Sequence, residues 1–172
     1  MQSIVDTAKK PLAGYLVGVR RPGDTATAAR DHLEELISLT DTYGVPVLGS
    51  EIVPLRDINP TYLIGGGKAE EIFRTCEGLG ADVIIFDDDL SPSQQRNWER
   101  LTKLAVIDRR EVILGIFADR ASTNEARLQV ELARAEYSLP RLTRAWTHLE
   151  RQRGGGGLRG GAGEAQLEVD RR

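Results

Sequence analysis

The segment Gly65-Gly66-Gly67-Lys68 contains the residue types in this sequence that most strongly suggest phosphate chemistry. A phosphate-binding loop of the GxxxxGK type needs Ser or Thr directly after the lysine and a glycine six residues before it. Those positions hold Ala69 and Tyr62, so the segment fails both tests. We interpret it as a glycine turn that leads into a helix beginning near Lys68. The alternative is weak anion binding at the N-terminus of that helix.

Three consecutive carboxylates, Asp87-Asp88-Asp89, follow an apolar run that reads as a buried strand. Carboxylate oxygens suit Mg²⁺, and open α/β sheets place ligands at the carboxyl ends of their strands. No phosphate-binding loop accompanies this triplet. We therefore favour a solvated turn in which one aspartate helps to cap the next helix, expected over 92–103, and keep magnesium binding as the alternative.

The other residues that commonly perform catalysis form no constellation. His32 and His148 lie far apart, and neither has a Cys or His neighbour at metal-binding spacing, so no zinc site is predicted. The single thiol, Cys76, has no base near it in sequence and is interpreted as a small residue of a helix. A lone cysteine cannot form an intrachain disulfide, which suits a reducing compartment. We predict no catalytic residue, metal site or cofactor in these 172 residues.

A glycine-rich stretch at residues 154–163 has arginines around it. One interpretation is a flexible linker. The other is a mobile tip on RNA, where glycine lets the backbone approach closely and arginine pairs with phosphates or stacks on bases. Its position between two helical segments favours the tip. The residues predicted to contact RNA are Arg144, Arg151, Arg153, Gly154, Gly155, Gly156, Gly157, Arg159, Gly160 and Gly161.

The charge is divided unevenly along the chain, although the total is only −3. Residues 141–172 hold seven arginines and four acids, a balance of +3. Residues 1–140 hold sixteen basic and twenty-two acidic residues, a balance of −6. A polyanion should therefore meet the basic C-terminal part first.

Two kinds of sequence pattern predict the helices and strands that position the residues described above. The first pattern covers residues 1–120. Short β-branched runs alternate with longer helical patterns, as in βαβ units with a parallel sheet. Helix starts are indicated by Asp24, by Asp108 with Glu111, and most clearly by Ser91, which precedes a proline and has Gln94 at the capping-box position. We predict an α/β fold with a small, mostly parallel sheet flanked by helices. The candidate strands are 15–19, 45–53, 83–86 and 105–107, with 62–64 as a possible fifth piece.

The second pattern begins at Ser122. Ser122 and Glu125 have the spacing of a capping box, which predicts the start of a helix. Apolar residues then recur at heptad spacing, which predicts a seam for one partner helix. Pro140 lies within it and should kink or split the helix near Leu139. We expect residues 121–172 to form an antiparallel helical pair, resembling a coiled coil, with a glycine-rich tip at 154–163. The seam residues are Leu128, Leu132, Ala135, Leu139, Leu142, Trp146 and Leu149.

Several ordered motifs, which together cover nearly the whole chain, resemble the N-terminal region of HflX-type GTPases. The glycine-lysine segment at 62–72, YLIGGGKAEEI, is one, and the helix start at 90–97, LSPSQQRN, is another. The remaining motifs are VIDR at 106–109, IFADRA at 116–121, EARLQVELA at 125–133, WTHLERQ at 146–152 and QLEVDRR at 166–172.

This resemblance implies functions that the residues alone do not. HflX proteins are GTPases that bind the large ribosomal subunit and can split ribosomes, so the resemblance implies binding to that subunit. We expect a cytoplasmic protein with no membrane association, because no apolar run in the sequence approaches the roughly 20 residues needed to span a bilayer. In the family, the glycine-rich loop between paired helices reaches the ribosomal RNA near the peptidyl transferase centre, which assigns that role to 154–163. The G domain, which holds GTP and Mg²⁺, should follow Arg172. We therefore expect this segment to lack GTPase activity itself and to contact its own G domain.

The sequence departs from the family pattern mainly in the loop. Ala162 stands where proline is expected, and Ala165 and Val169 stand where threonine is expected. Gly156 replaces an aliphatic residue and Gly66 a polar one. These changes leave the expected fold intact but should make the loop more flexible.

Two other function classes stay open at this stage. One is an NTP-binding α/β domain that uses 65–68 and 87–89. The other is a purely intramolecular regulator that packs on the G domain and restrains it.

Overall fold

The computed structural model describes residues 12–141, which form an α/β unit followed by a further helix. The strands alternate with helices along the chain, as the sequence pattern predicted. In chain order the elements are β1 (Gly14–Arg20), α1 (Ala26–Tyr43), β2 (Val47–Pro54), α2 (Gly66–Leu79), β3 (Val83–Phe86), α3 (Pro92–Thr102), β4 (Ala105–Asp108), α4 (Arg109–Arg120), α5 (Asn124–Ser138) and the 3-10 turn η1 (Leu139–Arg141).

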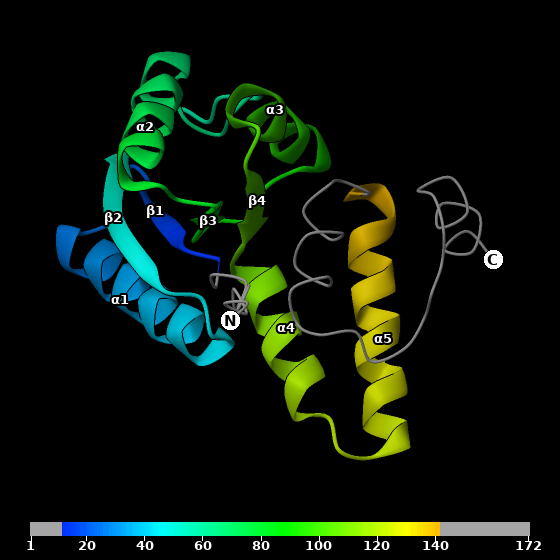
Figure 1. The fold of residues 1–172 in the computed structure, drawn as a ribbon. Coiled ribbons are helices and arrows are strands. Elements are labelled where there is room, and N and C mark those ends of the chain that lie inside the picture. The colour runs from blue at the N-terminus through cyan, green and yellow to red at the C-terminus, as the bar shows by residue number, and fades with distance from the viewer. Residues whose placement is uncertain (1–11, 142–172) are drawn as a thin grey trace, which may run out of the picture.

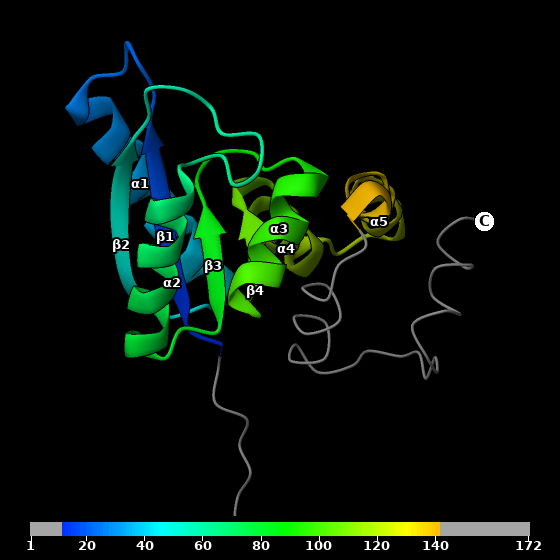
Figure 2. The ribbon, with the colours of Figure 1, turned by 90° about the horizontal axis from the view of Figure 1, so that it is seen from above.

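The four strands form one parallel sheet in the order β2-β1-β3-β4. Chain order reverses at β1, because β2 joins one of its edges and β3 the other. Helices α2 and α3 cover one face of the sheet, and α1 and α4 cover the other (Figure 1). Helix α5 lies beside α4, away from the sheet (Figures 1 and 2). The predicted α/β class with a small parallel sheet is confirmed.

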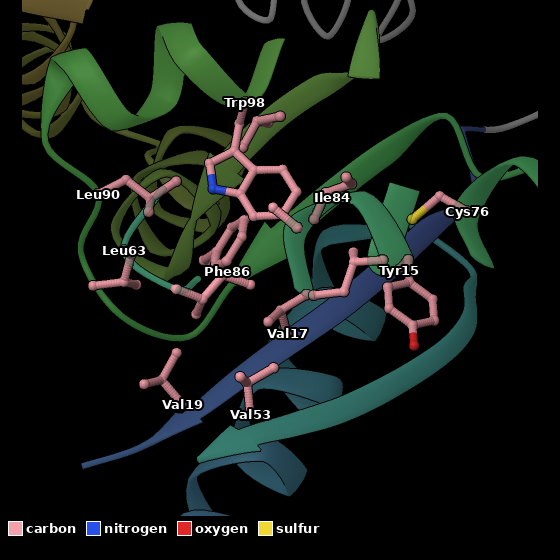
Figure 3. Packing of buried hydrophobic residues seen from close by; sticks show 14 of the residues in the cluster. Tyr15, Val17, Val19, Val53, Leu63, Cys76, Ile84, Phe86, Leu90 and Trp98 are labelled. Atoms are coloured by element: carbon pink, nitrogen blue, oxygen red, sulfur yellow. The ribbon is translucent and has the colours of Figure 1, made fainter. Parts of the chain in front are cut away.

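Burial on both faces explains the nearly continuous apolar runs of the central strands. The core beneath α2 and α3 is built around Trp98, which packs against Phe86 (Figure 3). The Trp98 ring lies 5.0 Å from that of Phe86 and 5.7 Å from that of Tyr62. The Trp98 indole donates a 2.9 Å hydrogen bond to the Tyr62 carbonyl, so its polar atom is satisfied inside the core. On the opposite face, Leu16 and Ile85 pack against α1 and α4.

Two predicted helix starts are confirmed. Ser91 accepts from the Gln94 amide and Gln94 reaches back to the Ser91 amide, which completes the capping box of α3. Asp108 caps α4 by accepting from the Glu111 amide.

Two other predicted caps are wrong by one residue. Thr25, not Asp24, caps α1, since Asp24 instead accepts from the Arg21 amide in the preceding turn. Likewise Thr123 rather than Ser122 caps α5, through the Ala126 amide. In both cases the hydroxyl of the following threonine accepts the hydrogen bond from an amide in the first turn of the helix.

The chain between β2 and α2 also differs from the prediction. Tyr62-Leu63-Ile64 forms no fifth strand, because Leu63 has a φ of 69° and makes only an isolated antiparallel bridge with Asn59. Helix α2 begins at Gly66, two residues before Lys68. Helix α5 ends at Ser138 and η1 contains Pro140, so the predicted break in the helix is confirmed. The second helix of the predicted pair and its glycine-rich tip lie outside the described residues, and the division into units at residue 120 stays a prediction.

Candidate functional site

The residues predicted to contact RNA, from Arg144 to Gly161, lie outside the described part of the chain. The structure does show how the chain is held just before them. Helix α5 and η1 are fastened to the α/β unit by a buried polar network, and its central group is the carboxylate of Asp108.

Asp108 ends β4 and is almost completely buried. Its Oδ1 accepts from the Glu111 amide at 3.2 Å, and its Oδ2 accepts from the Leu90 amide at 3.2 Å and from the Tyr137 hydroxyl. Burial raises the pKa of this carboxyl above its ordinary value, although the three hydrogen bonds act in the opposite direction. Burial also raises the pKa of Tyr137, and the neighbouring carboxylate raises it further, so the phenol stays protonated as a donor.

Arg141 completes the attachment of α5. Its guanidinium donates to the Leu90 carbonyl at 2.7 Å and to the Tyr137 carbonyl at 3.3 Å, and lies 4.0 Å above the Tyr137 ring. Arg96 on α3 adds a 3.4 Å bond to the Pro140 carbonyl. These contacts fix where the chain leaves the α/β unit towards residue 142.

The opposite face of α5 carries the predicted heptad seam and is exposed. Leu128 is 66% exposed, Leu132 is 61% exposed and Leu139 is 39% exposed. Ala135 is exposed as well. The seam is therefore not the face by which α5 is attached to the rest of the described chain.

The face that carries Tyr137 was missed by the sequence analysis. A second apolar stripe with 4-3-4 spacing runs along α5, and it is buried or half-buried. It was hidden because two of its members are alanines, which also occur on solvent-facing helix surfaces. The stripe consists of Ala126, Val130, Ala133 and Tyr137.

The lysine of the glycine-lysine segment is held by two carboxylates. The Lys68 ammonium lies 2.7 Å from Glu51 Oε2 and 2.9 Å from Glu71 Oε1. Its pKa is raised above the ordinary value, first by the hydrogen bond with Glu51 and then by that with Glu71. Glu51 also accepts a 2.9 Å hydrogen bond from the Tyr15 hydroxyl. Lys68 thus ties the first turn of α2 to β2, which supports the structural interpretation.

The aspartate triplet is also engaged by arginines. Asp87 Oδ1 lies 2.7 Å from the guanidinium of Arg109, and Asp88 Oδ2 lies 2.8 Å from that of Arg21. Burial raises the pKa of Asp87, while Arg109 lowers it. Ser91, and not an aspartate, caps α3. Within residues 12–141, no three metal-ligating side chains gather to form a cation site.

The remaining candidates have ordinary structural places. Cys76 is buried in the core under α2, and burial raises its pKa to about 12, which disfavours the reactive thiolate at neutral pH. The His32 carbonyl accepts a 2.8 Å bond from Arg109. His148 lies outside the described residues. No helix between residues 12 and 141 is long and apolar enough to cross a bilayer.

Two family models match the chain. The model described as GTP-binding GTPase N-terminal matches residues 30–118, and the model described as GTP-binding GTPase Middle Region matches residues 120–172. The first alone covers more than half of the chain. These matches define the class as the N-terminal and middle regions of GTP-binding GTPases.

Curated relatives identify the family within this class. The GTPase HflX of Escherichia coli K12 is 51% identical over 146 residues, which are 83% of this chain and 33% of the relative. That of Magnetococcus marinus is 44% identical over 169 residues, 98% of this chain and 39% of the relative. The chain belongs to the HflX family and matches its N-terminal part. It spans 33% to 39% of the length of these relatives.

Solved structures support the fold. A variant of SsGBP has a TM-score of 0.60 and is 26% identical, with 76% of this chain and 40% of that chain covered. A GTP-binding protein of Sulfolobus solfataricus in complex with GDP has a TM-score of 0.57 at 24% identity, with 83% of this chain and 42% of that chain covered.

Proposed function

We propose that this chain is the ribosome-docking part of an HflX-type GTPase and that residues 141–163 contact ribosomal RNA of the large subunit near the peptidyl transferase centre. The observation that carries the proposal is the attachment of α5 and η1 through Asp108, Tyr137 and Arg141. This attachment delivers the arginine- and glycine-rich segment from a fixed point on the α/β unit. A linker between independent domains would need no such anchor.

Charge supports the same assignment. The part up to residue 140 has a balance of −6 and should be repelled by RNA, whereas residues 141–172 have a balance of +3. Arg144, Arg151, Arg153 and Arg159 can neutralise phosphates, and the glycines let the backbone approach RNA closely.

The exposed seam of α5 supports the predicted antiparallel helical pair. Leucines at heptad spacing normally cover a partner helix, and a contiguous exposed row of them is unusual on a protein surface. We propose that helix-forming residues after the glycines, 164–172, return along Leu128 and Leu132. The glycine-rich stretch would then form the tip of the pair.

The proposal for the full-length protein follows from the family. A G domain that binds GTP and Mg²⁺ would hydrolyse the nucleotide, and docking of the present region would couple hydrolysis to ribosome splitting in the cytoplasm. These 172 residues contain no GxxxxGK phosphate-binding loop followed by Ser or Thr, so we expect the pure chain to hydrolyse no GTP.

Cosedimentation with large ribosomal subunits across a salt series tests docking directly. If about three arginines contact phosphates, log K should fall with log salt at a slope of roughly −2 to −3. Replacing Arg151, Arg153 and Arg159 together by Ala should weaken binding and flatten the slope. The matched control replaces Arg74, Arg100 and Arg120, which are exposed on the α/β unit, and removes the same charge. Equal effects of the two triple variants would refute a specific contact by the tip.

A regulatory role towards the G domain remains compatible with docking. It predicts that the GTPase rate of the full-length protein changes when residues 1–120 are removed.

The NTP-binding alternative is disfavoured, because Lys68 and Asp87 are both engaged in ion pairs within the fold. Calorimetry with ATP and GTP tests it, and we expect no heat of binding attributable to residues 65–68.

A further inference from the structure

A cavity of about 230 Å³ opens between α1 and β2, at the carboxyl ends of β1 and β2. This volume is several times the roughly 30 Å³ that one water molecule occupies in the liquid. The end of the sheet at which it lies is where open α/β sheets place their ligands. The cavity is lined by Arg20, Ala26, Ala29, Arg30, Ile52 and Pro54.

Arg20 occupies an unusual position for a cation. It is the last residue of β1 and alternates with Leu16 and Gly18 on the strand face that packs towards α1. Its side chain is half-buried, and within residues 12–141 its guanidinium has no ion-pair or hydrogen-bond partner. Partial burial of an unpaired charge is unfavourable, and an anion in the cavity would remove that cost.

A second guanidinium borders the same cavity from α1. Arg30 is exposed and, like Arg20, is unpaired among the described residues, although Glu34 follows one helical turn later. Ala26 in the first turn of α1 borders the cavity too, where the helix dipole favours negative charge. The lining contains two arginines and no carboxylate. This contrasts with Arg21 and Arg109 nearby, both of which are paired with aspartates.

We propose that this cavity is a phosphate-binding site on the α/β unit, with Arg20 and Arg30 as the groups that hold the phosphate oxygens. Planar guanidinium groups bind phosphate in a bidentate manner, and two of them around one concave site suit a single phosphate group. The phosphate can be a phosphodiester of an RNA backbone or a free phosphate monoester. None of the lining residues belongs to 141–163, and the proposal does not depend on docking of those residues to the ribosome.

Nuclear magnetic resonance titration of the 172-residue chain tests the site. One arm adds inorganic phosphate, a second adds a short oligouridylate without a terminal phosphate, and a third adds sodium chloride at matched ionic strength. We expect saturable shifts of the Thr25–Ala29 amides and of the Arg20 and Arg30 guanidinium signals. Saturation with both phosphate ligands assigns a phosphodiester site, and saturation with inorganic phosphate alone assigns a monoester site; both results support the proposal.

Variants separate the site from general charge effects. Arg30→Gln lies on an exposed helix position and should weaken phosphate binding about tenfold without unfolding the chain, because a hydrogen bond to a charged group is lost. Arg100→Gln on α3 removes an exposed arginine on the opposite face of the sheet and should leave binding unchanged. Arg20→Lys retains the charge and should weaken binding less than Arg20→Gln.

Shifts that sodium chloride reproduces, or an Arg30→Gln chain that binds like wild type, would overturn the proposal. Ribosomes are absent from every arm, so either result leaves the docking proposal untouched.

Discussion

The hydroxyl of Tyr137 on α5 donates a hydrogen bond to the buried carboxylate of Asp108 at the end of β4. These residues lie 29 positions apart, and the bond joins the helix that precedes the glycine-rich segment to the sheet. The carboxylate also caps α4 and accepts from the Leu90 amide. The Asp108 side chain therefore connects α5, the first turn of α4 and the chain segment just before α3.

Tyr137→Phe should destabilise the attachment of α5 by about 1.5–3 kcal/mol, because a buried carboxylate loses a hydrogen-bond donor. Urea unfolding with hydrogen exchange on α5 measures this. Tyr62→Phe is the matched control, since the Tyr62 ring packs on Trp98 but its hydroxyl bonds to no other described residue. If the two variants lose the same stability, the Tyr137 hydroxyl contributes nothing specific.

The raised pKa of Asp108 gives the stability a pH dependence of definite sign. The folded chain binds this proton more tightly than the unfolded chain, so the contribution is full below the ordinary carboxyl pKa of 3.8 and falls as pH rises through the higher folded value. Asp108→Asn should remove this dependence. The unfolding free energy of the wild type minus that of the variant should therefore decrease as pH rises from 3.8. The pKa of Asp87 is raised as well, but Asp87 is present in both chains, so its contribution cancels in this difference.

Urea unfolding of both chains between about pH 3.5 and 7 measures that difference. A difference that grows with pH would mean that the bonds from Tyr137, Leu90 and Glu111 outweigh burial at this carboxyl.

Helices α1 and α4 cross where Gly115 faces the ring of Tyr43. A Cβ at position 115 would lie 2.1 Å from Tyr43 Cε2, closer than any real contact. Gly115→Ala should destabilise the chain by about 1–3 kcal/mol through overpacking. Gly78→Ala in α2 is the matched control, because a Cβ there meets nothing within 4 Å. Alanine at that position should stabilise the helix by about 0.5–1 kcal/mol. Thermal unfolding compares the two, and equal behaviour would contradict the close approach.

The order of the elements could be predicted from local patterns, whereas their tertiary contacts could not. The apolar run at 83–86 matches β3, and the Ser91 cap fixes the start of α3. Both could be predicted because a buried strand and a helix cap are each indicated by residue types within a few positions of one another. The cap at Asp24 was wrong, since an adjacent Thr25 can satisfy the same amides and sequence alone does not choose between them.

The candidate sites illustrate the same limit. Lys68 forms ion pairs with Glu51 and Glu71, but Glu51 lies in β2 and no local sequence pattern joins it to Lys68. The network of Asp108 and Tyr137 and the cavity at Arg20 depend on contacts between distant segments. Asp108 was expected only as a helix start, and Tyr137 and Arg20 belong to none of the motifs quoted above, so the network and the cavity became visible only in the fold.

Cys76 should resist alkylation in the folded chain. Burial raises its pKa to about 12 from an ordinary 9.0, so at about pH 8 the thiolate population falls roughly a thousandfold. Iodoacetamide labelling of native and urea-unfolded chains, followed by mass spectrometry, compares the rates at the single thiol. Native labelling as fast as labelling of the unfolded chain would place Cys76 outside a stable core.

The exposed seam of α5 yields the last prediction, which tests the proposed helical pair. If residues 164–172 pack along Leu128 and Leu132, Leu132→Asp places an unpaired charge in a covered seam and should cost several kcal/mol in local stability. Amides of α5 and of 164–172 should then exchange faster, while those of β1 stay protected, because the sheet does not depend on the seam. Gln129→Asp is the matched control, since Gln129 is exposed on α5 outside the heptad positions, and it should change stability by less than about 0.5 kcal/mol. Hydrogen exchange with mass spectrometry resolves the three segments. Indistinguishable exchange in the two variants would mean that the leucine row faces solvent in the whole chain and that residues 164–172 pack elsewhere.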